Sequence, residues 1–482
     1  MRVRKRKYKY GKGTWFFRII FIISLIIFMI FSIMLSKLDM IPFKYLLIFY
    51  IVFGLLYLYL LFTSIPKKIK FGIKVSSCVV LDIFSIVFGI GIKYLDNTMD
   101  FVNVISKDLS QNEVYYVMVL EDSKYEKIKD LKGRDIGIYS SKNSENANEK
   151  LNKKIENNSK EYKNVVEMFE DLRDSKLDAV LINGSTRNLL DSDLADMDID
   201  LKEIYKLSIS IEKEDIVKVV DVTKKTFNIF VAGGDAYGSI DNVTNTDVNM
   251  IITVDPVNKK LLLTSIPRDY YVNLPSFGDN AYDKLTHAGY YGIEESVKAV
   301  ENLLDVDINY YVKVNFSTIV GVIDAIGGVD VESDYKFCIE GGGPCFKKGN
   351  NYMNGTKALA FARERHSFKD GDVQRVKNQQ KVLMAIIDKA SSSTTIITNF
   401  SKILDSVSDS FSTNMETKDI NKLVKMQLND MSTWSIESQN LVGTDLYSKD
   451  TYTFPNLELY VMKQDTESVN TAKEKIKGYL NK

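Results

Sequence analysis

Histidine, cysteine, tryptophan and proline are scarce in this chain: its 482 residues include two histidines, three cysteines, two tryptophans and seven prolines. So few histidines and cysteines are a poor source of the four ligands of a tetrahedral zinc site, and zinc is not expected. An excess of charge is missing as well, because 63 basic residues balance 63 acidic ones. Composition therefore gives no reason to expect a nucleic-acid partner. The Gly-x-Ser-x-Gly, Walker and Rossmann patterns are also absent.

Three long apolar runs occupy the N-terminal part, at residues 15–35, 45–65 and 75–92. Each is long enough, or nearly so, to cross a hydrocarbon core of ~30 Å as a helix. Basic residues cluster before the first run and between the second and third. The positive-inside bias then places the N-terminus in the cytoplasm and residue 96 onward outside the cell. The sequence predicts a multi-pass cell-membrane protein with a large extracellular C-terminal part.

Asp82 lies near the middle of the third run, where a charged side chain is costly and often functional. Two interpretations stay open. Asp82 contacts a partner in the membrane, or it faces another helix and is hydrogen-bonded or protonated there.

The predicted organisation has four parts. They are a basic cytoplasmic tail (1–14), three transmembrane helices (15–95), an extracellular accessory domain (96–218) and a second extracellular domain (219–482). In the accessory part, helical patterns at 125–131 and 165–175 alternate with strand patterns at 133–139 and 177–182. This order favours a small α/β domain. Phrases within it resemble pieces of extracellular solute-binding proteins, although only about half of such a protein would fit.

Two cysteines, Cys338 and Cys345, bracket a short Gly-rich turn in the part predicted to lie outside the cell. A disulfide is permitted in that compartment and is favoured over two free thiols. Cys78 lies in the third apolar run, where it is expected to be inert packing.

The second extracellular domain opens with strand patterns at 227–232, 248–254 and 261–266. The first ends in Gly233-Gly234-Asp235, where glycines allow close approach of backbone to a ligand. Folding the next two as a hairpin about positions 257/258 places Asp247 opposite Arg268. The sequence thus predicts an acid and a base at the open end of the hairpin, near Asp235.

Further positive side chains follow. A short helix is expected at 354–360, and in a strand after it Arg363 and Arg365 would point to one face. Paired guanidinium groups suit a pyrophosphate, which accepts bidentate hydrogen bonds. Asp372 is expected to cap the next helix, on which Arg375 and Gln379 share a face.

Each of these motifs alone has a simpler structural explanation, since most arginines on strands are solvated or paired with acids. Their occurrence together, at strand ends and helix starts, indicates a site for a phosphate-rich ligand. Asp235 and Asp247, together with phosphate oxygens, would suit Mg²⁺ or Mn²⁺.

These residues resemble the LytR-CpsA-Psr family. The resemblance rests on Gly233-Gly234-Asp235, Thr246-Asp247, residues 265–269, residues 283–288, residues 326–330, residues 353–355, residues 358–365, Gly371-Asp372, Arg375 and Gln379. It is strong over about 222–390 and weaker to the C-terminus. Three spans with an accessory domain are similar to the capsule-associated branch. The implied fold is a central mixed sheet flanked by helices around an apolar lipid tunnel.

The resemblance implies transfer of a glycopolymer, such as capsular polysaccharide or a teichoic-acid-like polymer, from a polyprenyl-diphosphate carrier to peptidoglycan. Arg268, Arg363, Arg365, Arg375 and Gln379 would bind the pyrophosphate. Asp235 and Asp247 would hold Mg²⁺ or act beside it, one of them as the base. The expected reaction is displacement at the sugar carbon that bears the phosphate. The leaving group is a lipid phosphate. Other capsule or wall assembly proteins are further partners that this role implies.

Two departures from the family pattern stand out, because Asn245 and Asn378 replace arginines that are common there. They make the phosphate cradle less positive. Two other functions remain open at this point: a non-catalytic scaffold or regulator that binds lipid phosphate, and a pyrophosphatase of lipid carriers that uses water as its acceptor.

Overall fold

The computed structural model describes residues 14–66, 69–106, 110–141, 143–190, 194, 197–212, 214–234, 245–369, 371–392, 402–403, 406 and 411–481. The chain divides into two compact units. The helical unit comprises Met1–Val104 and Glu416–Met431, and the α/β unit comprises Ile105–Met415 and Ser432–Lys482.

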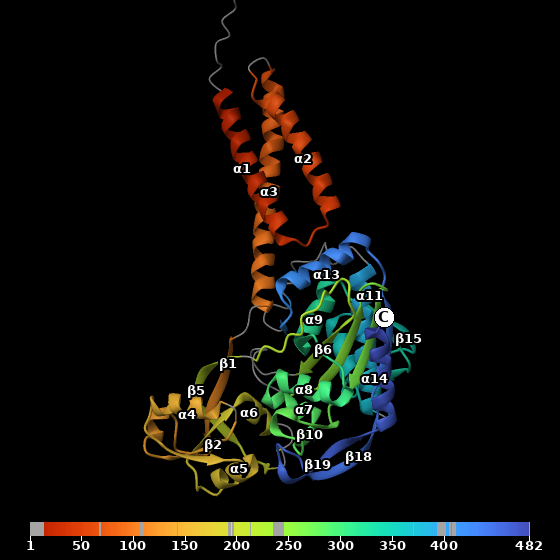
Figure 1. Cartoon of the computed structure of the whole chain (residues 1–482). Coiled ribbons are helices and arrows are strands. Elements are labelled where there is room, and N and C mark those ends of the chain that lie inside the picture. Colours follow the sequence, from red (N-terminus) through yellow and green to blue (C-terminus); the bar gives the residue numbers. More distant parts are fainter. Residues whose placement is uncertain are drawn as a thin grey trace, which may run out of the picture. The chain divides into compact units, whose positions relative to one another are not determined.

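The helical unit holds the three apolar runs as helices that lie side by side (Figure 1). These are α1 (Thr14–Leu38), α2 (Phe43–Ser64) and α3 (Phe71–Ser106), joined in the unit by α13 (Thr417–Asp430). Each of the first three is long and apolar enough to cross a membrane. Aromatic side chains fill the space between them, with Phe28 stacked on Tyr57 at 4.8 Å between ring centroids. The three helices predicted from the apolar runs are therefore present.

The third helix differs from its predicted span in length. At 36 residues, α3 is about 54 Å long. It extends well past both ends of the predicted span at 75–92 and past a hydrocarbon core of ~30 Å. Asp82 is exposed on this helix.

The α/β unit begins with a five-stranded sheet in the order β3-β2-β4-β1-β5. Its strands are β1 (Ser110–Leu120), β2 (Asp135–Tyr139), β3 (Asn158–Tyr162), β4 (Ala179–Asn183) and β5 (Leu201–Glu212). Its helices are α4 (Ser144–Asn152), α5 (Val165–Arg173) and α6 (Gly184–Leu190). β2 pairs in parallel with β3 and β4, as expected for strands joined through helices. The predicted helix at 125–131 is wrong in extent, because only Ile128–Leu131 forms a 3-10 turn.

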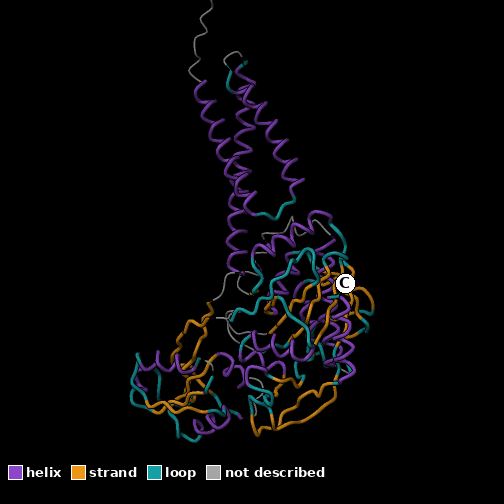
Figure 2. The backbone as a smooth tube through the Cα atoms, in the orientation of Figure 1, coloured by secondary structure: helices purple, strands orange, loops and turns teal. Residues whose placement is uncertain are grey.

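A six-stranded mixed sheet forms the centre of the second domain, in the order β16-β11-β6-β7-β8-β17. Strands are drawn in orange in Figure 2. Its strands are β6 (Phe227–Gly234), β7 (Val248–Asp255), β8 (Lys260–Ile266), β11 (Tyr310–Asn315), β16 (Phe411–Thr413) and β17 (Ser435–Asn440). The three strands predicted in this domain match β6, β7 and β8 to within two residues. Burial of their apolar side chains on both faces explains why their sequences read as nearly continuous apolar runs.

Helices cover both faces of this sheet. On one face, α8 (Ile293–Leu304) and α14 (Thr466–Leu480) pack on Ile251, Leu262 and Ile266. Ser265 points to the other face, because side chains alternate along a strand. There its hydroxyl accepts a hydrogen bond from Gln380 of α11 (Gly371–Ser392) at 2.9 Å. α9 (Phe316–Ala325) and α10 (Gly355–Arg363) share a second core with α11.

Short paired strands and helices complete the domain. They are β9 (Tyr271–Asn273), β10 (Tyr282–Lys284), α7 (Leu285–Ala288), β12 (Val329–Ser333), β13 (Phe337–Cys338), β14 (Cys345–Phe346), β15 (Gly349–Met353), β18 (Gly443–Asp450) and β19 (Pro455–Gln464).

The accessory sheet and the second domain share a hydrophobic core within the α/β unit. Tyr290 and Phe454 of the second domain are buried among accessory residues such as Phe169 and Ile182. Behind them lies a buried acid, Asp283, which accepts a hydrogen bond from the Thr453 amide at 2.6 Å. The Nδ1 atom of His287 lies 2.6 Å from the same carboxyl group.

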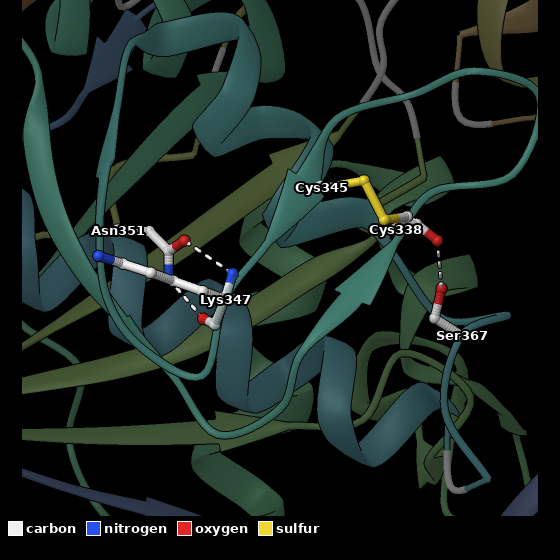
Figure 3. Close-up of a disulfide and its surroundings, with 5 residues drawn as sticks. All are labelled: Cys338, Cys345, Lys347, Asn351 and Ser367. Carbon is white, nitrogen blue, oxygen red and sulfur yellow. Dashed lines mark hydrogen bonds between the residues drawn. A yellow bond between two sulfur atoms is a disulfide. The ribbon is translucent and has the colours of Figure 1, made fainter.

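Cys338 and Cys345 form a disulfide between the paired strands β13 and β14 (Figure 3). The turn beside it is tied by Asn351, whose side chain accepts from the Lys347 amide at 3.0 Å and donates to the Lys347 carbonyl at 2.8 Å. Ser367 donates to the Cys338 carbonyl at 3.4 Å, which connects the hairpin to the segment after α10.

Replacing Cys338 and Cys345 together by serine should lower the free energy of local unfolding of this hairpin by about 2.5 kcal/mol, because the open chain regains loop entropy. Amide hydrogen exchange over residues 337–346 in the full-length protein measures this change. Cys78→Ser is the matched control. Unchanged exchange in the double variant would mean that the surrounding hydrogen bonds alone hold the hairpin closed.

Candidate functional site

The site lies at the open end of the β7–β8 hairpin. The ladder runs from Asp255↔Lys260 to Asn249↔Ile266, and continuing this register by two residues on each strand places Asp247 opposite Arg268. An Nη1 atom of Arg268 donates to Oδ1 of Asp247 in an ion pair. Each side chain keeps about a quarter of its surface exposed, so the pair can be reached by a ligand. The predicted hairpin axis is confirmed.

Further charged and polar groups surround this pair. Asn245 donates to Oδ1 of Asp247 at 3.4 Å. Asp269 lies 3.7 Å from Nε of Arg268 and 3.8 Å from Nζ of Lys284. Lys284 was missed by the sequence analysis as a site residue, although it lies in the 283–288 motif that supports the resemblance. Its side chain is nearly buried beside Asp269, at 7% exposed.

A pocket opens beside the ion pair and holds about 730 Å³ of empty space, part of it continuous with solvent. α11 contributes Arg375 and Gln379, which lie one turn apart as predicted. The lining consists of Asp247, Val248, Asn249, Ser265, Ile266, Pro267, Arg268, Asp269, Val373, Arg375, Val376, Gln379, Asn440, Leu441, Val442, Gly443 and Met462. Polar and charged groups thus share one cavity with a wall of valine, leucine and methionine side chains.

Part of this lining comes from the C-terminal end of the chain. Asn440 ends β17, which pairs in parallel with β8 so that Asn440 lies opposite Ser265. Sequence analysis did not place 440–443 at the site. The only available signal was the apolar Leu441-Val442 pair before a glycine, which is too common to indicate a pocket.

Arg363 and Arg365 are not part of the described pocket lining. The predicted strand at 361–365 is wrong in its first half, because α10 continues to Arg363 and the chain becomes extended only at Glu364. Both arginines are exposed while Glu364 is 8% exposed, so the expected alternation of faces still occurs. Nε of Arg365 donates to His366 at 3.3 Å.

The predicted set includes two further acidic residues, Asp235 and Asp372. Asp235 follows β6 directly and lies outside the described residues, as do 236–244. Asp372 was expected to precede its helix as an N-cap. That expectation is wrong, because α11 already includes Asp372 as its second residue.

Asn378, which stands in place of an arginine common in the family, has a structural role. It is 1% exposed and donates to the Phe361 carbonyl at 3.2 Å while accepting from Gln374 at 2.9 Å. Gln374 also donates to Asp334 at 3.3 Å. The hydrogen bond from Lys381, the largest influence on Asp334, holds the pKa of that carboxyl below its usual value. A neutral amide thus joins α11 to the end of α10 without adding charge to the cradle.

The described residues contain no group of three or more metal-ligating side chains. Of the two proposed metal ligands, Asp247 lies within the described residues. Its carboxyl group accepts hydrogen bonds from Arg268 and Asn245. Together, the positive side chains and the apolar wall can receive an anionic group attached to an apolar chain, which is the chemistry of a lipid phosphate.

Comparison with known proteins identifies two regions. Residues 196–474 match the model of the LytR_cpsA_psr family, and residues 102–233 match a model described as NMT1/THI5 like. A polyisoprenyl-teichoic acid–peptidoglycan teichoic acid transferase, TagV of Bacillus subtilis (strain 168), is 34% identical over 247 residues. That alignment covers 49% of this chain and 62% of TagV.

A second relative, the transferase TagU of Bacillus anthracis, is 36% identical over 189 residues, which is 39% of this chain and 60% of TagU. The chain thus spans about three fifths of the length of these relatives. The crystal structure of B. subtilis TagV superposes with a TM-score of 0.45 at 31% identity, over 54% of this chain and 98% of that one.

The ion pair makes a prediction about anion binding. Asp247→Asn should raise the affinity for inorganic pyrophosphate in metal-free buffer, because Arg268 loses its competing carboxylate. Arg268→Ala should lower that affinity about tenfold, as expected for a lost charge-assisted hydrogen bond. Calorimetric titration of the full-length protein measures both. Lys298→Ala, which removes an ion pair with Glu214 outside the pocket, is the control. Weaker binding by Asp247→Asn would contradict this account of the pair.

Proposed function

We propose, from the premise that this chain belongs to the LytR-CpsA-Psr family, that it transfers a wall glycopolymer from a polyprenyl-diphosphate carrier to peptidoglycan. The family assignment rests on the match over residues 196–474. The names of its relatives describe teichoic acid transfer to peptidoglycan. The observation that carries the proposal is the Asp247–Arg268 pair at a pocket lined by both charged and apolar side chains.

The charged and polar side chains of this lining would bind the diphosphate. Arg268 and Arg375 supply guanidinium groups from different elements, and Gln379 adds an amide donor beside them. Guanidinium groups suit phosphate because their planar donors form paired hydrogen bonds with its oxygens. Arg363 and Arg365 are proposed to join this set when the ligand is bound, since both side chains are exposed just after α10.

The apolar side chains of this lining would contact the polyprenyl chain next to its phosphates. Val373 and Val376 of α11 face this cavity together with Leu441, Val442 and Met462. Burial of prenyl methylene groups there is favourable by about 0.8 kcal/mol each. This arrangement supports the proposed apolar tunnel and explains why a lipid-linked rather than a free phosphate would be the donor.

In the proposed reaction, an acceptor hydroxyl attacks the carrier-linked glycan while a carboxylate, Asp247 or Asp235, takes its proton. The arginines stabilise negative charge on the departing lipid phosphate. If the sugar C–O bond breaks, the lipid leaves as a diphosphate. If the P–O bond breaks, as in phosphotransfer, the lipid leaves as a monophosphate and the product keeps a phosphodiester. The mass of the released lipid therefore identifies the bond.

A divalent cation, Mg²⁺ or Mn²⁺, is proposed to be held by Asp247 and Asp235 together with phosphate oxygens. The carboxylate of Asp247 is of the oxygen-donor type that these ions prefer, and its partial exposure leaves room for a ligand. When bound, the cation would neutralise charge on the diphosphate. We place the α/β unit on the outer side of the cell membrane, from the positive-inside pattern and the three candidate spans.

The direct test uses the full-length protein in nanodiscs with a polyprenyl-diphosphate-linked oligosaccharide, Mg²⁺ and peptidoglycan fragments. A glycan–peptidoglycan adduct should form, and Arg268→Ala, Arg363→Ala and Asp247→Ala should each slow it at least about tenfold, or about 1.4 kcal/mol in barrier. Mass spectrometry follows both products, and Lys298→Ala serves as the control.

The other outcomes separate the remaining functions. Release of lipid phosphate without an adduct would indicate the pyrophosphatase. Tight binding of the carrier without turnover would indicate the scaffold or regulator. Near-normal rates in all three site variants would show that the reaction takes place elsewhere.

Removal of divalent cations with EDTA should abolish transfer, and Mg²⁺ or Mn²⁺ should restore it. Asp247→Asn should raise the Mg²⁺ concentration needed for half-maximal rate about tenfold, because one anionic ligand is lost. A titration of rate against Mg²⁺ for both proteins measures this. An unchanged half-maximal concentration would place the cation away from Asp247.

A further inference from the structure

Helix α13 has an unusual place in the topology. It follows β16 and precedes β17, which are the two opposite edge strands of the six-stranded sheet. The chain must therefore cross from one edge of this sheet to the other through α13. Yet residues 416–431 belong to the compact unit formed by α1, α2 and α3. The crossover of the catalytic sheet is thus part of the helical unit (Figure 1).

Three polar contacts join α13 to the connection between α1 and α2. The side-chain amide of Asn421 donates to the Leu38 carbonyl at 2.8 Å. Lys425 forms an ion pair with Asp39 at 2.6 Å. Near the end of α13, the ammonium group of Lys44 donates to the Asn429 carbonyl.

The spacing of these contacts matches one side of a helix. Residues 421, 425 and 429 follow one another at intervals of four, which stacks them along a single face of α13. Their partners lie within residues 38–44. Over two helical turns, one face of α13 therefore contacts the same short connection between α1 and α2.

The contacts also supply hydrogen-bond donors to carbonyl groups in the last turns of both α1 and α13. The Leu38 carbonyl belongs to the last turn of α1 and the Asn429 carbonyl to the last turn of α13, where carbonyl groups lack partners within their own helix. Asn421 of α13 supplies the donor for the first, and Lys44 supplies it for the second. A cation at a helix C-terminus is further favoured by the helix dipole.

We propose that α13 and residues 38–44 form a latch that holds the catalytic sheet at the outer membrane surface, within reach of a carrier embedded in the bilayer. This rests on the proposed function. A polyprenyl chain confines its diphosphate to the surface of the membrane, so the site must be kept at that level. In the proposed topology, the connection between α1 and α2 lies at the outer surface, and α13, which links the two edge strands of the sheet, is bound to this connection.

The latch variant combines Asn421→Ala with Lys425→Glu, which removes the buried hydrogen bond and sets two acids against each other. Full-length protein in nanodiscs is assayed with two carriers: one with a full-length polyprenyl chain, and one whose short prenyl chain leaves it in solution. Transfer from the embedded carrier should fall at least about fivefold, whereas transfer from the soluble carrier should stay within about twofold.

Two matched variants accompany it. Lys422→Glu makes the same charge change on the same helix, but Lys422 pairs with Asp419 of α13 itself at 2.8 Å, so it should leave both rates unchanged. Lys425→Glu with Asp39→Lys reverses the ion pair and should recover transfer from the embedded carrier relative to Lys425→Glu alone. Equal losses with both carriers, or no loss with either, would overturn the latch.

A readout without activity separates this proposal from the proposed function. Asp39→Cys with Lys425→Cys should be joined by a short bis-maleimide in native membranes, and the linked peptides should be seen by mass spectrometry. Asn421→Ala should reduce the yield. Absence of the link would overturn the latch even if transfer is observed. A clear link in a protein that transfers from neither carrier would instead reject the function and leave the contact standing.

Discussion

The ion pair between Asp247 and Arg268 is the interaction on which the site depends. It lies two residues beyond the last paired residues of β7 and β8, so the register of the hairpin decides whether the two charges meet. β8 also pairs with β17 on its other side, which places Asn440 opposite Ser265. The strand β8 therefore aligns Asp247, Arg268 and the C-terminal part of the pocket lining.

Much of this arrangement could be predicted from the sequence, because it depends on local patterns. Strand alternation and a short loop define the hairpin, and the four-residue spacing of Arg375 and Gln379 defines a shared helix face. The pocket wall at Leu441 and Val442 could not be predicted. It depends on parallel pairing between strands far apart in the chain, which leaves no local pattern.

The errors have equally physical causes. The chain from 362 to 365 alternates in burial as a strand would, yet Asn354 caps a helix that continues to Arg363. Local alternation over four residues does not distinguish the two. The sequence also did not show that Asn378, a neutral residue where an arginine is common in the family, is buried. Its hydrogen bonds with Gln374 and the Phe361 carbonyl make it part of the packing between α10 and α11.

The core shared by the accessory sheet and the second domain has a consequence for the history of this protein. Tyr290 and Phe454 are buried against accessory residues, and Thr453 beside them donates to the buried Asp283, one residue before Lys284 of the site. The two domains cannot be exchanged like independent modules. A lineage that lost the accessory sheet would have to replace its apolar contact surface with polar side chains while keeping Asp283 and Lys284 in place.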